Sequence, residues 1–434
     1  MLDINYIRDN RQKVEDAIKN KGYTIDLDEI LQLDDARKEL SQKTDILRQE
    51  RNQISSQMKN GQPDQALISR GKEIKQELSS LEEKLSSVES DFLAKLKTVP
   101  NVPCDDVPVG LSEDENEVAE VCGEPTKFNF EPKNHYEIGQ ARGWIDKERA
   151  SKVTGARFAY IKGEMVSLQM AIVNFVMNSL SDEGVIKEIC EANHLEHIST
   201  KPFTTVLPPL MLRTEMYDAM DRLEPRDDRY KIEGEELWLQ GSAEHVLGSM
   251  HAGEIFAEKD LPVRYLGYAT SFRQEAGTYG KDMEGIIRMH QFDKLEMESF
   301  STKETSREEH ELFVAIQRWL IEQLRLPYRV IRKCTFDIGK PDARGIDMEV
   351  WLPGQGKYRE THTADYMTDY QSRRLNTRVR RDETGEVELV HTNDATAFAL
   401  GRIMIAVIEN YQNEDMTVRV PEVLRKYLNG KEIL

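Results

Sequence analysis

The chain has 434 residues, of which 39% are hydrophobic and 32% are charged, and its formal net charge is −19. This length predicts two or three domains with a hydrophobic core, and no window approaches the ~18 consecutive apolar residues of a membrane span. The charged N-terminus shows no secretory signal, and the four dispersed cysteines indicate neither a disulfide framework nor a zinc site, so we expect a cytoplasmic protein.

Two long helices are predicted near the N-terminus, and together they form an antiparallel hairpin. In each helix, apolar residues recur with the heptad spacing of a coiled-coil seam. The first seam comprises Leu33, Leu40, Leu47 and Ile54, with Ala36 and Met58 beside it, and the second comprises Ile74, Leu78, Leu81, Leu85, Val88 and Phe92. Residues 59–65 contain Asn60-Gly61 and Pro63, which favour a turn between the helices.

The narrow seam leaves the outer faces of this hairpin in water. Residues 1–100 hold 17 Lys and Arg against 19 Asp and Glu, so most of the net negative charge lies in the rest of the chain. Because Lys and Arg supply much of the affinity for phosphate, this part is the more suited to RNA. The pattern alone is more typical of a generic coiled-coil spacer or dimer arm. The basic residues on the outer faces include Arg37, Lys43, Arg48, Arg51, Lys72 and Lys75.

A domain boundary is predicted where the second helix ends. Pro100 and Pro103 stop the helix, and an acidic stretch at 104–130 reads as a linker. Beyond it, helix-like segments such as Val166–Leu180 alternate with short β-branched runs without regular strand–helix crossovers. We therefore expect residues 1–103 to form a helical domain and 131–434 an α+β domain built on an antiparallel sheet.

The segment 271–298 carries the strongest indication of chemistry. Arg273 and Glu275 lie two residues apart, so on a strand both project from one face. A Gly-punctuated stretch from Gly277 to Gly285 then reverses the chain before a second strand-like run. That run carries Arg288, His290, Phe292 and Glu296 on one face. Guanidiniums, carboxylates and an aromatic ring suit an adenine, a phosphate chain and a zwitterion, although a solvated polar hairpin fits the periodicity too.

Two long motifs connect these residues to a known family. Phe-Arg-x-Glu-Ala-Gly at 272–277, followed by Gly-x-x-Arg-x-His-Gln-Phe-x-Lys-x-Glu at 285–296, resembles motif 2 of the seryl-tRNA synthetases, which are class II aminoacyl-tRNA ligases. Residues 401–427 resemble motif 3 and the closing segment of that family. Thr205-Val206-Leu207-Pro208-Pro209 is similar to motif 1, whose proline, here Pro209, lies at the interface of a homodimer. The resemblance covers essentially the whole chain and implies a class II catalytic domain, an antiparallel β-sheet flanked by helices, with an N-terminal coiled-coil arm.

The resemblance also implies a reaction and the residues that perform it. L-Serine and ATP form seryl-adenylate, and the seryl group passes to tRNA(Ser), which the arm's basic residues contact. Arg273 would bridge the serine carboxylate and the α-phosphate, and Arg288 would hold the outer phosphates. Glu275 would accept from the adenine amino group, while Phe292 and Arg402 cover the two faces of the ring. Glu360 and Thr363 match ligands of Mg²⁺. Ser242, Glu244, Glu296 and Thr396 match the serine-binding residues.

Three departures from the family pattern surround the expected amino-acid pocket. Residues 360–367 read Glu-Thr-His-Thr-Ala-Asp-Tyr-Met where Glu-Ile-Ser-Ser-Cys-Ser-Asn-Cys is expected, and 393–397 read Asn-Asp-Ala-Thr-Ala instead of Leu-Asn-Gly-Ser-Gly. Ser242 stands in place of Thr. His362 is either a structural donor or a residue that reshapes the magnesium or serine site. Besides a serine ligase, the sequence therefore leaves open a paralogue that activates another small amino acid and a non-catalytic RNA-binding relative.

Overall fold

The computed structural model describes residues 1–59, 65–275 and 285–434, and the chain divides into two compact units, Met1–Val102 and Pro103–Leu434. The first unit is helical. Its elements are α1 (Ile4–Asp9), α2 (Arg11–Asn20), α3 (Leu27–Lys59) and α4 (Gln65–Leu96). None of the described helices combines the length and the apolar character needed to cross a membrane.

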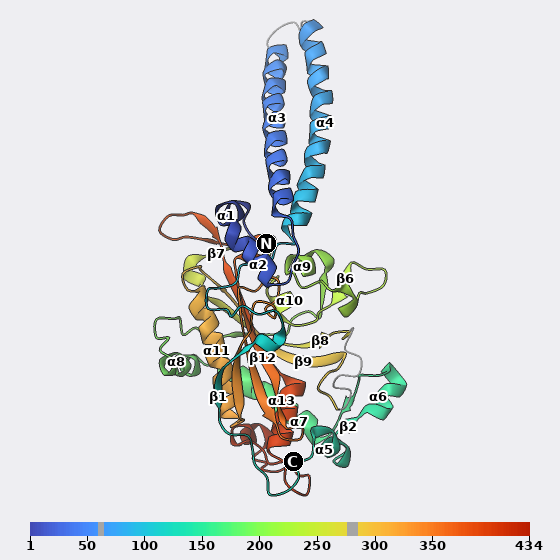
Figure 1. The fold of residues 1–434 in the computed structure, drawn as a ribbon, viewed down its shortest axis with the longest axis vertical. Coiled ribbons are helices and arrows are strands. Elements are labelled where there is room, and N and C mark those ends of the chain that lie inside the picture. The colour runs from blue at the N-terminus through green and yellow to red at the C-terminus, as the bar shows by residue number, and fades with distance from the viewer. Residues whose placement is uncertain (60–64, 276–284) are drawn as a thin grey trace. The chain divides into compact units, whose positions relative to one another are not determined.

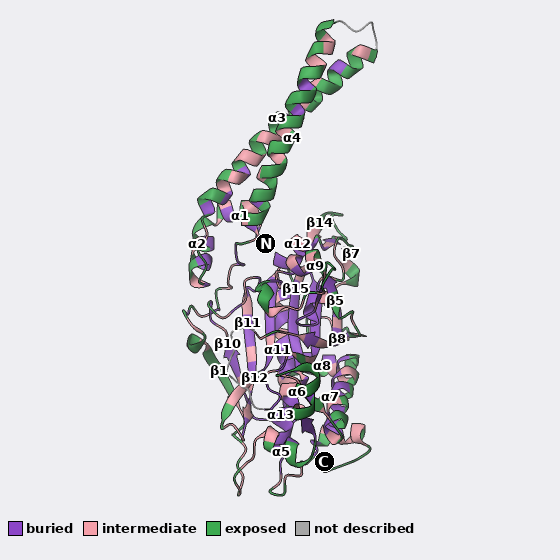
Figure 2. Ribbon diagram, turned by 90° about the vertical axis from the view of Figure 1, so that its right-hand side faces the viewer, coloured by how far each residue is buried: buried purple, intermediate pink, exposed green. Residues whose placement is uncertain are grey.

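Helices α3 and α4 lie side by side as the predicted antiparallel hairpin (Figure 1). The seam is made by Ile54, Ile74 and Leu78, which are buried, with Leu47 and Met58 packed against them. Outside the seam, most of both helices is exposed, as Figure 2 shows. The heptad pattern therefore predicted this hairpin correctly, because only an a/d stripe is apolar enough to hold the two helices together. The predicted turn at Asn60-Gly61 and Pro63 lies outside the described residues.

The second unit is built on an eight-stranded sheet with the order β1-β10-β11-β12-β15-β9-β8-β4. Neighbouring strands of this sheet run antiparallel, apart from β4 and β8, which are parallel. The strands are β1 (Glu117–Cys122), β4 (Thr204–Val206), β8 (Val263–Phe272), β9 (Gln291–Ser301), β10 (Tyr328–Arg332), β11 (Arg344–Leu352), β12 (Lys357–Thr368) and β15 (His391–Ala399).

Helices cover one face of the sheet and bury its apolar side chains. Leu295 and Met297 of β9 join one hydrophobic core with residues of α7 (Glu164–Leu180), α11 (Ser306–Gln323) and α13 (Leu400–Asn410). The intervening residues Lys294, Glu296 and Glu298 point to the opposite face, because successive side chains alternate along a strand. The α+β architecture is confirmed, and the opposite face, against which the short helix α10 packs at β8, carries the polar side chains.

Shorter elements surround the sheet. The helices are α5 (His135–Ala141), α6 (Lys147–Thr154), α8 (Glu183–Ala192), α9 (Thr214–Ala219), α10 (Glu244–Leu247), α12 (Tyr370–Leu375) and α14 (Glu422–Arg425), and the strands are β2 (Ile145–Asp146), β3 (Tyr160–Ile161), β5 (Met211–Arg213), β6 (Leu237–Leu239), β7 (Ile255–Ala257), β13 (Arg378–Arg380) and β14 (Val387–Leu389).

The acidic segment 104–130, which the sequence presents as a linker, carries an edge strand of the sheet. β1 pairs antiparallel with β10, from Glu117 opposite Arg332 to Cys122 opposite Tyr328. Most of its side chains are exposed, so the strand lacks the alternation of buried and exposed residues by which a strand is predicted.

The predicted hairpin around motif 2 is present, but its strands are shorter than expected. β8 and β9 pair antiparallel from Val263 opposite Phe300 to Phe272 opposite Gln291. Glu275 lies beyond the end of β8, and Arg288 precedes β9, so their placement on strand faces was wrong, whereas Arg273 still bonds across the hairpin to His290. Glu275 has a φ of 54°, a left-handed conformation that leaves the extended strand path. Residues 276–284 of the predicted reversal lie outside the described residues.

Candidate active site

A cavity of about 130 Å³ opens on the polar side of the sheet, where β8, β9, β12 and β15 meet the start of α13. An adjoining cavity of about 750 Å³ shares Arg273, Arg288, Lys294, Glu360 and Thr363 with it and also reaches Glu244. The smaller cavity is lined by every residue expected to bind ATP: Arg273, Glu275, Arg288, Phe292, Glu360, Thr363 and Arg402.

Three guanidiniums reach this site, and each is held by a neighbour. The Nε of Arg273 donates to the carbonyl of Gly241 at 3.0 Å, and its guanidinium lies 5.4 Å from the centre of the Phe292 ring. Arg288 pairs with Glu275 at 2.5 Å. Arg402 donates to the backbone carbonyl of Glu360 at 2.9 Å and pairs with its carboxylate at 3.1 Å. Guanidiniums gathered beside an aromatic ring suit a purine nucleotide with its phosphates.

Hydrogen bonds to other segments of the chain hold the residues after β8 in place. The Arg273 amide donates to the carbonyl of His290 at 3.0 Å, which continues the β8–β9 ladder by one residue. The Glu275 amide donates to Asp228 at 2.8 Å, and Arg157 donates to the Glu275 carbonyl at 3.1 Å. These bonds explain how Glu275 keeps its left-handed backbone and faces the cavity although it lies outside the sheet.

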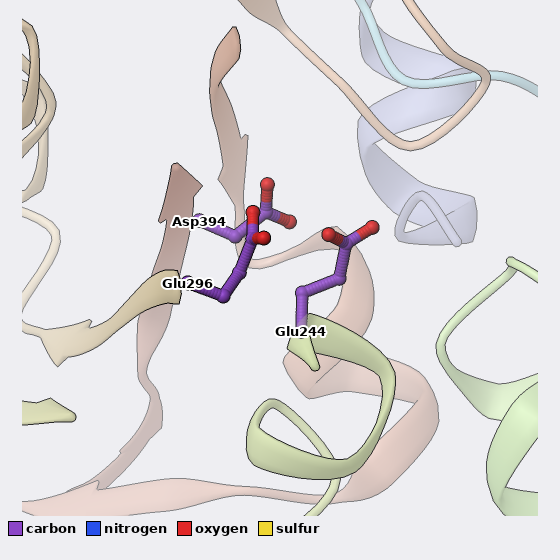
Figure 3. Close-up of side chains that lie close together, drawn as sticks. All are labelled: Glu244, Glu296 and Asp394. Atoms are coloured by element: carbon purple, nitrogen blue, oxygen red, sulfur yellow. The ribbon is translucent and has the colours of Figure 1, made fainter. Parts of the chain in front are cut away.

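Beside the arginines, three buried carboxylates converge. Glu244 begins α10, Glu296 lies on β9 and Asp394 lies on β15, and one oxygen of each lies within 4.8 Å of the others (Figure 3). Two hydroxyls join them: Ser242 donates to Glu244 at 2.7 Å, and Thr396 donates to Glu296 at 3.2 Å. The expected serine-binding residues Ser242, Glu244, Glu296 and Thr396 are therefore brought together.

Lys294 contributes a positive charge to this carboxylate pocket. It is 5% exposed, and its Nζ lies 2.7 Å from Glu296 and donates to the Ser242 hydroxyl at 2.9 Å. Burial raises the pKa of Glu296 to about 7, although Lys294 opposes that rise. Burial also works against ionisation of Glu244, but a hydrogen bond with His245 and the charges of Lys294 and Arg222 bring its pKa well below the usual range. The two carboxyls therefore differ sharply in proton affinity.

The residues expected to bind Mg²⁺ offer only oxygen ligands. Glu360 and Thr363 both line the two cavities, and Asp347 lies opposite Thr363 in the β11–β12 register. Lys333 lies 3.7 Å from Asp347 and 3.4 Å from Asp365 and offsets part of the negative charge. Carboxylate and hydroxyl oxygens are the ligands that a hard divalent cation prefers, so this set fits Mg²⁺.

His362 lies on the core side of the sheet and lines neither of the two cavities described above. It is 1% exposed, its Nδ1 lies 2.7 Å from the Thr361 hydroxyl, and its ring is 5.1 Å from that of Phe398. Burial lowers its pKa to about 3, so the ring is neutral at physiological pH. Of the two alternatives for His362, the structure favours the structural one.

Three residues of the site were not assigned a role from the sequence. Lys294 could have been found, because it lies two residues before Glu296 and shares its strand face. Asp394 was recognised as unusual, but only the pairing of β15 with β9 brings it beside Glu244 and Glu296. Arg222 lies in the loop after α9, and nothing near it in sequence indicates its contact with Glu244 and Asp394 at 3.6 and 3.5 Å.

The basic residues predicted to contact RNA fall into two groups. Arg37 pairs with Asp34 at 2.7 Å and lies over the Phe92 ring, while Lys43 pairs with Glu39 and Arg48 with Glu82. Arg51, Lys72 and Lys75 are exposed, and no ion pair is found for them among the described residues. The second group is thus the more available for phosphates.

Pro209 lies in the connection between β4 and β5. It is exposed, and so are its apolar neighbours Leu207, Leu210 and Met211, with Leu207 77% accessible. Adjacent exposed apolar side chains are typical of an interaction surface.

Two protein-family models match the chain. Residues 1–103 match the seryl-tRNA synthetase N-terminal domain, and residues 229–411 match the tRNA synthetase class II core domain of the G, H, P, S and T enzymes. The chain is 38% identical over 436 aligned residues to a protein named serine–tRNA ligase from Thermodesulfovibrio yellowstonii, with 99% of each chain covered. It is equally similar to the protein of that name from Geobacter sulfurreducens, at 38% identity over 434 residues.

Solved structures agree with these sequence matches. A seryl-tRNA synthetase from Pyrococcus horikoshii, complexed with ATP, superimposes with a TM-score of 0.88 at 36% identity, covering 100% of this chain and 99% of that one. A cytoplasmic serine–tRNA ligase from Naegleria fowleri, in complex with AMP, superimposes with a TM-score of 0.83 at 26% identity over 100% and 98% of the two chains. With full-length relatives well above 30% identity, the chain belongs to the seryl-tRNA synthetase family.

Proposed function

We propose that this protein ligates L-serine to tRNA(Ser) at the expense of ATP, through a seryl-adenylate intermediate. The observation that carries the proposal is the juxtaposition of an arginine-lined cavity with a buried carboxylate pocket. The first suits the phosphates and adenine of ATP, and the second suits the ammonium group of a small amino acid. The relatives' shared name, serine–tRNA ligase, supports serine as that amino acid.

In the first step, a serine carboxylate oxygen attacks the α-phosphorus of ATP and pyrophosphate leaves. This displacement needs alignment and charge neutralisation rather than a protein nucleophile. Arg273 would bridge the attacking carboxylate and the α-phosphate. Arg288 would give up its ion pair with Glu275 and bind the outer phosphates instead. Glu275 then becomes free to accept from the adenine amino group. Phe292 and Arg402 would enclose the adenine ring.

Glu360 and Thr363 would hold Mg²⁺, which neutralises phosphate charge when it is bound. In this structure Arg402 pairs with the Glu360 carboxylate. Binding of adenine by Arg402 and of the metal by Glu360 would therefore each compete with this ion pair. In the amino-acid pocket, Glu244 and Glu296 would accept from the serine ammonium, and Thr396 would contact its hydroxyl. A pocket that pairs the hydroxyl discriminates against alanine, because alanine leaves buried polar groups without partners.

In the second step, a hydroxyl of the terminal adenosine of tRNA attacks the seryl carbonyl and AMP leaves. We assign this tRNA contact to residues 1–103, through the exposed cations of α3 and α4, and both catalytic steps to residues 131–434. The exposed apolar loop at Pro209 supports a homodimer. A cytoplasmic location follows from the same proposal, because that is where the chain would meet charged and uncharged tRNA.

Amino-acid-dependent exchange of pyrophosphate into ATP tests the first step. Serine, threonine, alanine, cysteine and glycine are offered separately with Mg²⁺, and we expect exchange with serine well above the others. R273A should reduce that exchange by at least about 100-fold, as expected for loss of a group that stabilises developing charge. Preference for another amino acid would favour a paralogue, and no exchange with any of them would favour a non-catalytic relative.

A further inference from the structure

The carboxylate pocket is closed at one end by a buried arginine. Arg222 directs its guanidinium at three carboxylates: Asp342 at 3.1 Å, Asp394 at 3.5 Å and Glu244 at 3.6 Å. Its side chain is 16% exposed, and the exposed part lines the larger cavity. Phe292, Glu296 and Glu298 follow one another along β9, and Asp394 pairs with Glu298. Because Arg222 contacts Asp394, it lies past Glu296, at the end of the site away from Phe292. It therefore faces the amino-acid end of the site rather than the nucleotide end.

The backbone around Arg222 is held by several other residues. The Arg222 carbonyl accepts from Arg229 at 3.1 Å, and the Met220 carbonyl accepts from Gln371 at 3.1 Å. Between them, the Asp221 carboxylate lies 2.7 Å from both Arg374 and Lys340. The guanidinium is thus presented by a braced segment, which suits a group that must keep other side chains in a fixed position.

Stability does not explain this cluster. Burying charges is costly, and replacing a buried ion network with apolar side chains is often neutral or stabilising. Burial raises the pKa of Asp394 and of Glu298, and the charge of Arg222 is among the groups that lower both, as it also does for Glu244. Arg222 therefore makes it easier for the pocket to hold negative charge, which an ammonium ligand requires.

Arg222 also lies against Glu244. The Nε of Arg222 is buried and makes no hydrogen bond among the described residues, while it lies 3.6 Å from one oxygen of Glu244. The other oxygen of Glu244 accepts from Ser242 at 2.7 Å. The carboxylate is thus fixed between a hydroxyl and a guanidinium, with its orientation toward Glu296 set from both sides.

We propose that Arg222 is a positioning residue for amino-acid binding, which orients Glu244 and Asp394 toward the substrate ammonium and keeps that pocket negatively charged. The inference rests on the proposed function, because it assigns the ammonium to this pocket. It concerns the binding of the amino acid and not that of ATP.

Steady-state pyrophosphate exchange with R222Q and R222A tests the role, with R226Q as the matched control. Arg226 lies four residues away and pairs with Glu224 at 2.8 Å on an exposed surface. For both Arg222 variants we expect the KM for serine to rise at least about tenfold, as for loss of a charged hydrogen bond, with the KM for ATP changed less than about twofold. R226Q should match the wild type in both constants.

Added guanidinium ion at millimolar concentration supplies a second readout. It should lower the KM for serine in R222A, where it can occupy the vacated space, and should not do so in R222Q or the wild type. Equal rises in both KM values, or no change in the KM for serine in a variant that still binds ATP, would overturn the role. If R222A does not fold, R222K replaces it: lysine keeps the charge but lacks the planar guanidinium that faces Asp342, Asp394 and Glu244 at once, so a serine KM equal to wild type would contradict the inference.

The wild-type assay separates this inference from the proposed function. If the wild type exchanges pyrophosphate with an amino acid other than serine, the proposed substrate is wrong, and the same variant series with that amino acid still decides the role of Arg222. If the wild type uses serine and the variants behave like R226Q, the inference alone fails.

Discussion

Glu296 is one of the carboxylates that we assign to the substrate ammonium, and its protonation changes close to neutral pH. It is fully buried, and burial raises its pKa to about 7 in spite of Lys294 at 2.7 Å. An acid with a raised pKa becomes neutral as the pH falls through that value, and a neutral carboxyl loses its attraction for the substrate ammonium. Amino-acid binding should therefore depend on pH close to neutrality.

We expect kcat/KM for serine to fall as the pH is lowered from about 8 to 6, approaching a tenfold loss per pH unit below the pKa of Glu296. The KM for ATP should stay nearly constant over the same range, because Glu296 lies outside the nucleotide cavity. Pyrophosphate exchange at several pH values measures both constants. A flat serine profile between pH 6 and 8 would contradict the assignment of Glu296 to the ammonium.

At the level of elements, an irregularity in β12 decides which of its side chains face the site. The register with β11 shifts between Met348 and Glu349, so Thr361 is an extra residue between the pairs His362 with Met348 and Glu360 with Glu349. In a regular strand, Glu360 would share a face with His362 rather than with Thr363. The bulge lets Glu360 and Thr363 both line the cavity while His362 points into the core.

The buried position of His362 predicts acid sensitivity of the fold. Its pKa is lowered to about 3, so the unfolded chain binds a proton below pH ~6.5 that the folded chain excludes, and stability is lost as the pH falls. Between pH 7 and 5 this histidine alone should cost about 2 kcal/mol of unfolding free energy. Between the same two pH values, urea denaturation should show that the unfolding free energy of H362Q falls by about 2 kcal/mol less than that of the wild type. Identical losses in the two proteins would show that His362 is protonated without cost.

At the level of the whole molecule, the distribution of charge supports the proposed division of tasks between the two units. The net charge of −19 is concentrated after residue 100, where it opposes binding of RNA. On α3 and α4, Arg51, Lys72 and Lys75 are exposed and form no ion pair within the described part of the arm, which makes them the best candidates for phosphate contacts.

Reversal of these three charges should separate the two steps of the reaction. For R51E/K72E/K75E we expect unchanged pyrophosphate exchange and a loss of tRNA aminoacylation. The logarithm of the affinity for tRNA falls linearly with the logarithm of the salt concentration, and the slope of this line should become shallower by about one for each cation removed. K43E is the comparison, because Lys43 already pairs with Glu39, and it should have a smaller effect. Equal loss of exchange and aminoacylation in the triple variant would contradict an RNA-binding role.

The exposed apolar loop at Pro209 predicts the oligomeric state. We expect a dimer of the 50.1 kDa chain by light scattering, because Leu207 and Met211 expose apolar surface that a second copy would bury. L207E/M211E should shift the protein toward the monomer, since it places charges in that surface. The wild type behaving as a monomer at micromolar concentration would exclude this interface.

The arm and the site differ in how far the sequence could predict them. The heptad seams predicted α3 and α4, because a coiled coil needs only local periodicity to be specified. The long motifs identified the family and the residues expected to contact ATP, and these residues line one cavity. Strand ends were less predictable: Glu275 leaves the sheet through a left-handed backbone that depends on contacts with Asp228 and Arg157, which are distant in sequence.

By itself, the sequence therefore determined the two-part organisation, the α+β class and which residues line the proposed nucleotide site. The tertiary structure alone added Asp394 and Arg222 to the pocket that the sequence had assigned to Ser242, Glu244, Glu296 and Thr396. Asp394 and Arg222 enter it because β15 pairs with β9 and because the loop after α9 returns to the sheet. The bulge at Thr361 likewise sets which residues of β12 face the cavity. These are long-range pairings, and no local pattern specifies which distant strand or loop will supply the opposite charge.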